Sequence, residues 1–404
     1  MSATDSHPSL EIPNRIALRL APDERELLAR VREVVAAEIA PRAAEVDQHK
    51  RFPAEGYQAL ARAGLAGLLM PVEFGGQGAS TVLYAAAMEE IAAACGSTST
   101  VYMTQMHCAH PIALAGTDDQ RARFIPGLCS GEMYGAIAIT EPDAGSDVSS
   151  IRTVARRENS GYVLNGQKTF ITSGDQADVV VLFATIDRSG GRQAFTSFLV
   201  EKGTEGFSSG PPMNKMGQRG SSTVELSLID CWVPLSSRLG DEGTAYQLSM
   251  RSVVKSRISA AAQGVGFARA AFERAARWAH EEGLLSGSNR HAQDVQFALA
   301  DMRSSIEAGR ALLSETAALV DAHPGDPITE VAVAKLHCTD LGMDIASRAM
   351  DLLGIDGDRV DLGIERIYRD VKVTQIYDGT NQVQRMLIAR DIRTTQEEAR
   401  NDHR

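Results

Sequence analysis

Apolar residues recur at helical spacing in the first third of the chain. Between Pro22 and Pro41 they occupy positions 27, 28, 31, 34, 35 and 39, which would lie on one face of an α-helix. Pro22 suits the first turn of that helix, and Pro41 favours its end. Further helices are predicted at about 53–63 and 81–94, on either side of the Gly-rich loop 70–78. Small residues dominate 81–94, which indicates close helix packing.

The pattern changes near Tyr134 to short runs rich in Val, Ile, Phe and Thr. These runs are YGAIAI, RTVARR, GYVLNG, DVVVLFATI, AFTSFLV and VELSLID, and Gly, Asn or Asp bounds them. Strands and turns at this spacing predict an antiparallel all-β unit. The Asn165-Gly166 pair predicts a turn between two of the strands.

Helical spacing returns after Gly243. The predicted helices span about 244–281, 292–322, 328–353 and 380–395, and the second carries an apolar stripe at positions 295, 299, 302 and 306. The chain is therefore predicted to be an α+β multidomain protein. Its parts would be a flexible tail (1–20), an N-terminal helical domain (21–133), a central antiparallel β-domain (134–242), a C-terminal helical domain (243–393) and a second tail (394–404).

Composition narrows the function classes. The 404 residues include 41 Lys and Arg against 52 Asp and Glu, and a net charge of -11 argues against a nucleic-acid partner. The five cysteines are odd in number and form no CxxC pair, which favours buried thiols over a disulfide framework or a zinc site. No run of about 18 apolar residues predicts a membrane span. The polar N-terminus does not resemble a signal peptide, so a cytoplasmic location is expected.

Three motifs carry candidate chemistry. AITEPDAGSD (138–147) follows a predicted strand and offers two hydroxyls and free backbone N–H groups, although an ordinary Pro/Gly turn would look the same. NGQKTFITSGDQAD (165–178) places Phe170 and Thr172 on one predicted strand face, or is simply a hairpin with a buried aromatic. In YRDVKVTQIYDGTNQVQR (368–385), Asp378 lies near a predicted helix start, either as an ionised base or as an N-cap residue.

Together, in this order and at these separations, the motifs resemble the acyl-CoA dehydrogenase superfamily from about residue 22 to 393. PVEFGGQG (71–78) and MRSVVKSRI (250–258) fit the same pattern. The resemblance implies that the C-terminal helices form a four-helix bundle. It also implies a flavoprotein, usually tetrameric, with FAD between the β-domain and the bundle. In that family a base takes the α-proton of an acyl thioester while the flavin takes the β-hydride. The implied partners are a CoA or carrier-protein thioester and an electron-transfer flavoprotein.

The resemblance also implies residue roles. Asp378 would be the catalytic base. Residues implied to bind the cofactor are Ile139, Thr140, Ser146, Phe170, Thr172, Thr380 and Gln382, with Phe170 in place of a tryptophan that covers the flavin. Residues implied to bind the substrate are Ser146, Ser256, Arg257, Tyr377 and Gly379.

The sequence departs from the family pattern at several of these positions. The usual base is glutamate, so Asp378 retracts the carboxylate by about 1.5 Å, and displacements near 1 Å can cost on the order of a hundredfold in rate. Ser256 occupies the position where some relatives carry the glutamate instead. Val254 replaces a polar residue that contacts the pantetheine arm in many relatives, which leaves carrier-protein substrates open.

Further departures affect residues that, in the family, grip the FAD pyrophosphate of a neighbouring subunit. Glu282 replaces an arginine, Leu285 an aromatic residue, Asp351 a glutamine and Ile355 a glycine. Carboxylates at these positions would repel a pyrophosphate, unless the loop is shifted and they face solvent. We therefore hypothesise a hetero-oligomer in which another subunit supplies this grip.

Three functions remain open from the sequence. The first is FAD-dependent α,β-dehydrogenation of an acyl thioester. The second is a flavin-dependent oxidase or monooxygenase of a nitroalkane-like or other acidic C–H substrate. The third is a non-catalytic or half-site subunit of a hetero-oligomeric dehydrogenase. Rapid oxygen consumption would distinguish the second, and an activity indifferent to Asp378→Asn would distinguish the third.

Overall fold

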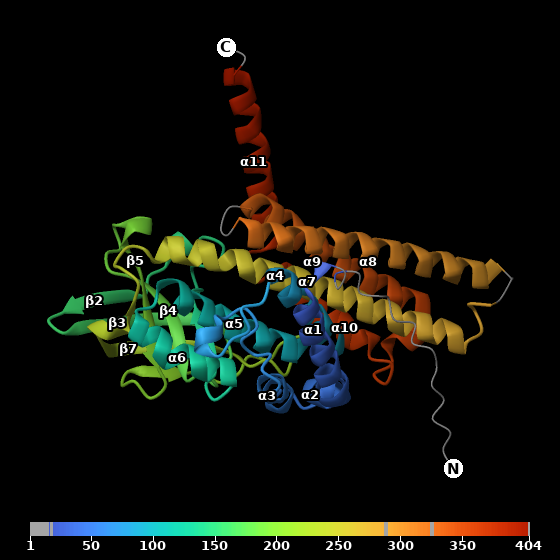
Figure 1. Ribbon diagram of the computed structural model, residues 1–404, viewed down its shortest axis with the longest axis horizontal. Helices are drawn as coiled ribbons and strands as arrows, with labels where there is room; N and C mark the ends of the chain where they lie inside the picture. The colour runs from blue at the N-terminus through green and yellow to red at the C-terminus, as the bar shows by residue number, and fades with distance from the viewer. Residues whose placement is uncertain (1–15, 17–18, 287–289, 324–326, 403–404) are drawn as a thin grey trace.

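The computed structural model describes residues 16, 19–286, 290–323 and 327–402. Helices come first along the chain, strands second and helices again last. The strands lie at one end of the molecule, and the long C-terminal helices run along most of its length beside the N-terminal helices (Figure 1). The predicted fold class is confirmed. Ile16 and Leu20 are buried in the core, so ordered packing begins before Ala21 and the expected N-terminal tail is too long. The rest of that tail, 1–15 and 17–18, lies outside the described residues.

The N-terminal helices follow the apolar pattern closely. The predicted helix from Pro22 begins where expected but continues past Val34 as a π-helical turn (Val35–Ile39) and a 3₁₀ turn (Ala40–Arg42). Two further helices, at 96–115 and 118–130, were not predicted. The first of them is buried on nearly all sides, so its sequence has no amphipathic periodicity. The helices are α1 (Pro22–Val34), α2 (Ala43–Gln48), α3 (Ala54–Arg62), α4 (Thr81–Ala94), α5 (Gly96–Ala115) and α6 (Asp118–Ser130).

The central domain is one sheet of eight strands. They are β1 (Gly135–Ala138), β2 (Val154–Glu158), β3 (Gly161–Thr172), β4 (Val179–Thr185), β5 (Phe195–Glu201), β6 (Phe207–Ser209), β7 (Thr223–Pro234) and β8 (Arg238–Leu239). Their order is β6-β7-β3-β2-β4-β5-β8, with β1 beside β4. Most pairs are antiparallel, as predicted, but β1 and β2 both pair with β4 in parallel.

The predicted turn at Asn165-Gly166 is wrong. β3 continues through both residues, and its register against β7 shifts between Leu164 and Gly166. The Asn165 side chain donates to Asp230 Oδ1 on β7 at 3.1 Å and accepts from Asp230 N at 2.9 Å. An Asn-Gly pair therefore marks a β-bulge here, a second role that the same residue types can fill.

Long helices form the C-terminal domain. They are α7 (Ala245–Glu281), α8 (Arg290–Ala322), α9 (Ile328–Leu353), α10 (Ile364–Val371) and α11 (Asn381–Asp402). The stripe predicted on the second helix is buried, since Val295, Leu299, Met302 and Ile306 are all in the bundle core. α11 begins at the bundle and then projects away from the body of the molecule (Figure 1). It stays helical to Asp402, beyond the predicted start of the C-terminal tail, although residues 389–399 are exposed.

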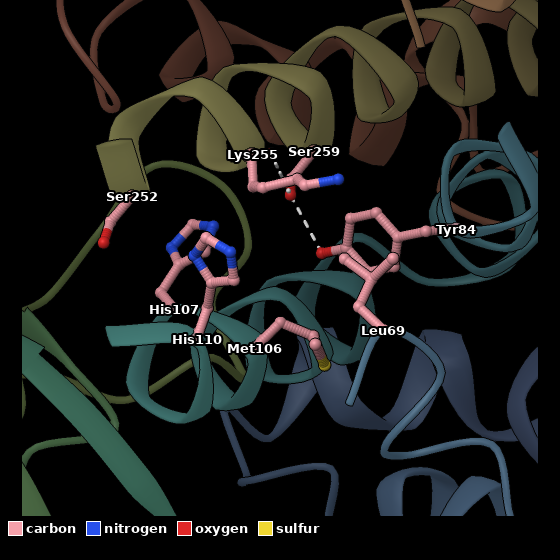
Figure 2. Close-up of a pocket in the computed structure, with 8 residues that line it drawn as sticks. All are labelled: Leu69, Tyr84, Met106, His107, His110, Ser252, Lys255 and Ser259. Carbon is pink, nitrogen blue, oxygen red and sulfur yellow. Dashed lines mark hydrogen bonds between the residues drawn. The ribbon is translucent and has the colours of Figure 1, made fainter. Parts of the chain in front are cut away.

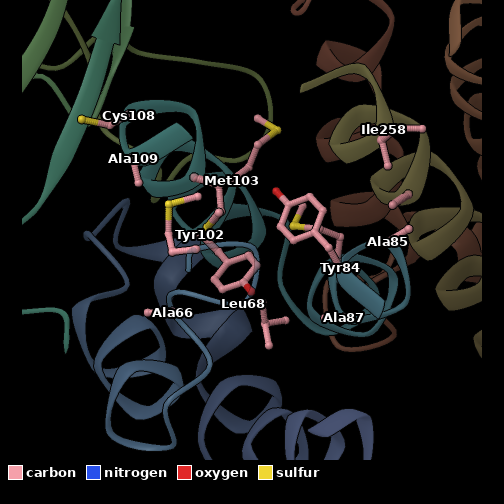
Figure 3. Close-up of a cluster of buried hydrophobic side chains, with 14 of the residues drawn as sticks. Ala66, Leu68, Tyr84, Ala85, Ala87, Tyr102, Met103, Cys108, Ala109 and Ile258 are labelled. Carbon is pink, nitrogen blue, oxygen red and sulfur yellow. The ribbon is translucent and has the colours of Figure 1, made fainter. Parts of the chain in front are cut away.

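Helix α7 joins the N-terminal core to the bundle through two glycines. A Cβ on Gly266 would lie 2.6 Å from the carbonyl oxygen of Glu89 in α4, and one on Gly264 would lie 2.3 Å from that of Cys338 in α9. Only glycine permits such close approach of helix backbones. Small residues of α4 and Ile258 of α7 pack with Tyr84 and Tyr102 in this core (Figure 3).

Charged residues are also buried where α4, α7 and α8 meet. Glu89 of α4 accepts from Arg310 Nε at 3.0 Å and pairs with Arg269 Nε at 3.0 Å. Glu90 accepts from Arg269 and Arg32 at 2.6 and 2.8 Å. The paired charges satisfy one another in a place where an unpaired charge is costly.

We predict that Glu89→Ala destabilises the protein by about 3–5 kcal/mol, because it leaves two buried guanidinium groups without their shared carboxylate. Urea unfolding of the purified protein measures the loss. The control is Glu315→Ala, which breaks an exposed ion pair with Arg19 and should have little effect. Equal unfolding midpoints for the two variants would contradict the prediction.

Candidate active site

Asp378 lies in a tight turn between a 3₁₀ turn (Lys372–Gln375) and α11. Its φ is 55° and that of Gly379 is 87°, both in the left-handed region. Aspartate tolerates this region better than most residues, and glycine adopts it freely. The N-cap contact of α11 comes from Thr380, whose Oγ1 accepts a hydrogen bond from Val383 N at 3.2 Å. The Asp378 carboxylate is therefore not needed to cap the helix.

The backbone of this turn is held by buried side chains from the bundle. Lys335 Nζ of α9 donates to the carbonyl oxygen of Gly379 at 3.0 Å and to Asn381 Oδ1 at 2.8 Å. Arg257 Nε of α7 donates to the Asp378 carbonyl oxygen at 3.4 Å. Burial lowers the pKa of Lys335 to about 8, opposed by Asp378. Lys335 and Asn381 were not predicted as site residues, and nothing in their sequence context distinguishes them from ordinary core and cap positions.

The carboxylate of Asp378 is oriented inward. Its Oδ2 atom is buried and accepts no hydrogen bond from the described residues, although the residue as a whole is partly exposed. Burial raises the pKa of Asp378, and this shift is opposed by His107, Lys335, Ser256 and Arg257. A buried carboxylate surrounded by cations and a hydroxyl is a strong candidate for proton transfer.

The predicted substrate-binding residues on α7 and beside Asp378 are placed as follows. Ser256 and Arg257 are buried on α7, and Ser256 Oγ donates to Val253 O at 3.0 Å. The hydroxyl of Tyr377 donates to Gln263 Oε1, so it is held within the protein. Val254 is buried and apolar.

The loop after β1 contains the predicted cofactor residues Ile139, Thr140 and Ser146. An ion pair fixes its start: Lys168 Nζ lies 2.7 Å from Glu141 Oε1 and donates to Ile139 O at 3.0 Å. Thr169 N donates to Thr140 O at 2.9 Å. Burial lowers the pKa of Lys168 to about 8, opposed by Glu141. Glu141 of the first motif and Lys168 of the second thus connect the loop to β3. The sequence did not predict this role. Ser146 itself is exposed.

Phe170 and Thr172 lie at the end of β3. Phe170 has a φ of 56° and is 66% exposed, and the register against β7 shifts between Lys168 and Ile171. The prediction that Phe170 and Thr172 share a face assumed the strict alternation of side chains in a regular strand. The irregularity interrupts that alternation. An exposed aromatic ring next to the partly exposed Thr172 fits the cover of a flat heterocycle. The structure also brings Ile139 and Tyr377 against one hydrophobic core.

The four positions that depart from the family's pyrophosphate grip lie at the end of the bundle opposite the Asp378 turn. Glu282 and Asp351 are exposed, Leu285 is half-buried and Ile355 is 87% exposed. Trp278 Nε1 of α7 donates to Asp356 Oδ2 at 3.3 Å, so the loops that follow α7 and α9 lie side by side. Gln382 at the start of α11 is exposed. Glu282 and Asp351 thus lie in one region, as expected from the sequence. Their exposure also agrees with the alternative that both carboxylates face solvent.

A small pocket lies between α4, α5 and α7 (Figure 2). Its lining residues are Leu69, Tyr84, Met106, His107, His110, Ser252, Lys255 and Ser259. Burial lowers the pKa of His107, an effect that Asp378 opposes, and burial raises the pKa of Tyr84, an effect to which Asp378 adds. Helix α7 connects the pocket with the Asp378 turn, since Ser252 and Ser259 line the pocket and Arg257 Nε donates to the Asp378 carbonyl oxygen. Sequence reasoning missed this pocket, although His107 and His110 are three residues apart on one helix and so share a face.

None of the described helices contains an apolar stretch of the length that a membrane span requires. The same residues contain no group of three or more His, Cys, Asp or Glu side chains that could hold a metal ion.

Comparison with known proteins places the chain in a family. Its residues match the acyl-CoA dehydrogenase N-terminal domain (21–132), middle domain (136–231) and C-terminal domain (242–393). A short-chain-specific acyl-CoA dehydrogenase from Clostridium acetobutylicum is 38% identical over 91% of this chain and 97% of its own length. Butyryl-CoA dehydrogenase from Megasphaera elsdenii superposes with a TM-score of 0.87 and 32% identity, over 92% of this chain and 98% of that one.

A chain described with the electron transferring flavoprotein of Acidaminococcus fermentans gives the same TM-score at 33% identity, with 92% of this chain and 98% of that chain covered. The protein belongs to the acyl-CoA dehydrogenase family. It is an oxidoreductase that acts on CH–CH groups, and the family implies a flavin cofactor.

We predict that Lys335→Met lowers the rate of acyl-CoA oxidation by about a hundredfold. Without its ammonium group the turn around Asp378 is free to shift, and displacements near 1 Å have costs of this order. Anaerobic flavin reduction by butyryl-CoA measures the rate, and a thermal melt checks the fold. Lys372→Met, which removes an exposed lysine, is the control. Equal rates in the two variants would show that Lys335 does not position the turn.

Proposed function

We propose that the chain catalyses FAD-dependent α,β-dehydrogenation of an acyl thioester, with Asp378 as the base that takes the α-proton. The observation that carries this proposal is the inward-facing Asp378 carboxylate, whose Oδ2 accepts no hydrogen bond from the described residues. The turn that carries it is bonded by Arg257 of α7, the helix that also lines a pocket with Ser252 and Ser259. An oxygen with a free lone pair in a water-poor site is available to accept a proton from a bound substrate.

The surroundings of Asp378 favour a carboxylate that can accept a proton. Burial raises its pKa, which makes it a stronger proton acceptor than an exposed aspartate. His107, Lys335, Ser256 and Arg257 oppose the shift and so favour the ionised form that a base must have. Lys335 and Arg257 also hold the carbonyl groups of the turn, which restricts where the carboxylate can move.

FAD supplies the acceptor for the β-hydride when it is bound. In this chain Thr140, Ser146, Phe170 and Thr172 would hold its ring system, with Ile139 at the substrate side. The exposed Phe170 ring supports this assignment, because a large aromatic residue gains little from water contact and suits a flat apolar partner. Thr380 and Gln382 would contact the adenine side, and the exposed Gln382 is free to do so.

The substrate proposed is an acyl-CoA. The relatives named above act on short-chain acyl-CoA and butyryl-CoA, and Arg257 retains its motif position beside Ser256. Gly379 and Tyr377 would flank the thioester next to Asp378. The buried Val254 offers no polar contact to a pantetheine arm, so an acyl-carrier protein is the alternative donor. We propose an electron-transfer flavoprotein as the acceptor of the electrons, in line with the chain described from Acidaminococcus fermentans.

We predict that Asp378→Asn slows anaerobic flavin reduction by butyryl-CoA by about 10²–10⁴-fold, the usual contribution of a general base. Asp378→Glu should keep measurable activity, because it restores the residue usual in the family and keeps an ionisable group. Flavin content and melting temperature of each variant serve as controls. An Asp378→Asn enzyme that reduces its flavin at the wild-type rate would contradict the proposed base.

A second candidate, a half-site subunit of a hetero-oligomer, rests on the exposed Glu282, Asp351 and Ile355 at one end of the bundle. We propose that these residues weaken the grip on the FAD pyrophosphate of an adjacent subunit, since carboxylates repel phosphate. The chain would then work in a tetramer with a different subunit.

We predict that Glu282→Arg combined with Asp351→Gln raises the FAD content of the purified chain. Flavin released on denaturation, divided by protein concentration, measures it. Glu281→Arg changes the charge of an exposed neighbour and should leave the flavin content as it is. If the unaltered chain already purifies as a homotetramer with one FAD per subunit, the half-site proposal is wrong and the homo-oligomeric dehydrogenase stands.

A further inference from the structure

A series of hydrogen bonds, here called the Tyr377 network, runs into the protein from the residue before Asp378. The Tyr377 hydroxyl donates to Gln263 Oε1 of α7. Gln263 Nε2 donates to Thr100 Oγ1 of α5 at 3.1 Å, and the Thr100 hydroxyl donates to Gln218 Oε1 at 2.5 Å. Every donor in this series points away from the Asp378 turn. Bonds arranged in this way polarise one another, so the loss of one weakens the others.

The far end of the Tyr377 network is anchored to α10. Gln218 lies in the loop before β7, where its backbone N–H donates to Asp370 Oδ1 and its Nε2 donates to Asp370 O at 3.1 Å. The neighbouring Arg369 donates to Met216 O of the same loop at 3.1 Å and pairs with Asp47 of α2 at 2.7 Å. The loop of the β-domain is therefore bonded to a C-terminal helix and, through Arg369, connected with an N-terminal helix.

The members of the Tyr377 network are shielded from water. The exposed fractions of Gln263, Thr100 and Gln218 are 0%, 3% and 2%. Buried amides and hydroxyls need protein partners, because water is not at hand to replace a lost bond. Gln263 Nε2 also donates to Ser99 Oγ at 2.8 Å, which limits its freedom further. The side chains therefore fix one another, and a shift of one must be taken up by the next.

The loop that contains Gln218 continues into a strand beside a proposed flavin residue. Four residues separate Gln218 from Thr223, the first residue of β7. Thr223 is paired in register with Thr172 at the end of β3. The Tyr377 network therefore connects the turn that carries Asp378 with the pair of strands that carries Thr172.

We propose that Gln263, Thr100 and Gln218 are positioning residues, which fix the base turn relative to the flavin-binding strands of the β-domain. This inference rests on the proposed dehydrogenase function, because the base and the hydride acceptor must both reach one bound acyl chain. Asp378 belongs to the C-terminal domain and Thr172 to the β-domain, so their separation depends on contacts between these domains. Since displacements near 1 Å can cost on the order of a hundredfold in rate, a bonded series of buried side chains is suited to hold it.

The Thr100 hydroxyl is the best place to interrupt the network, because valine has nearly the same shape as threonine. We expect Thr100→Val to lower the rate constant of anaerobic flavin reduction at saturating butyryl-CoA by about tenfold, with little change in KM. Thr100→Ser keeps the hydroxyl and should restore the rate constant.

Thr104→Val is the matched control. Thr104 is buried on the same helix, and its hydroxyl donates to Thr100 O within α5 at 2.8 Å, so its loss leaves the network complete. The rate constant of this variant should equal that of the wild type. Equal rate constants for Thr100→Val and Thr104→Val would overturn the proposal.

A double-mutant cycle shows whether the residues act together. Tyr377→Phe removes the hydroxyl at the other end of the network and should lower the rate constant by a similar factor. If both hydroxyls act through Gln263, the variant that combines Tyr377→Phe with Thr100→Val should lose little more than either single variant. Two factors that multiply in the combined variant would contradict a shared network.

Hydrogen exchange, followed by mass spectrometry, tests the network apart from the reaction. In the FAD-loaded protein, Thr100→Val should raise exchange both in residues 376–380 and in residues 217–222, and Thr104→Val should raise it in neither. If the wild type reduces no flavin with butyryl-CoA but both regions respond in this way, the network stands and the dehydrogenase function fails. If the wild type is active and neither its rate nor its exchange responds to Thr100→Val, the function stands and the network fails.

Discussion

The site depends on one constraint: a buried carboxylate must be held in a backbone conformation that few residues adopt. Asp378 and Gly379 both have positive φ. Lys335 of α9 and Gln384 of α11 hold the turn, since both donate to Gly379 O, and Lys335 also donates to Asn381 Oδ1. A cation thus fixes the turn and at the same time favours the ionised form of the carboxylate. Lys335 therefore contributes both to the position and to the charge of the base.

The rest of the architecture brings the parts of the site together around α7. Gly264 and Gly266 let α7 approach α9 and α4 closely, and Ser256 and Arg257 on the same helix reach the Asp378 turn. The buried ion pair of Lys168 and Glu141 plays the matching role in the β-domain, where it ties the loop after β1 to β3. Pairing explains why these charges can be buried at all, and why removing one partner should cost more than removing both.

Much of the fold could be predicted because periodicity reports burial directly. The apolar stripe on α8 identified its buried face correctly, and the small residues of α4 correctly indicated close packing. Prediction failed where burial is uniform, as in α5, and where a residue type has two roles, as with Asn165, which forms a bulge where a turn was expected. The motif around Asp378 was found from its sequence, but Lys335 was not. The role of Lys335 arises from contacts between segments far apart in the chain, and one sequence carries no record of such contacts.

The central claim is that Asp378 removes the α-proton, and isotope exchange tests it apart from the redox step. (Methylthio)acetyl-CoA has an α-hydrogen but no β-hydrogen, because its β atom is sulfur, so a base can act on it while oxidation cannot proceed. The account predicts that the FAD-loaded enzyme exchanges the α-hydrogen of this thioester with D₂O, as followed by NMR, and that Asp378→Asn abolishes the exchange while flavin remains bound. Undiminished exchange in Asp378→Asn would contradict the account and assign proton removal to another group.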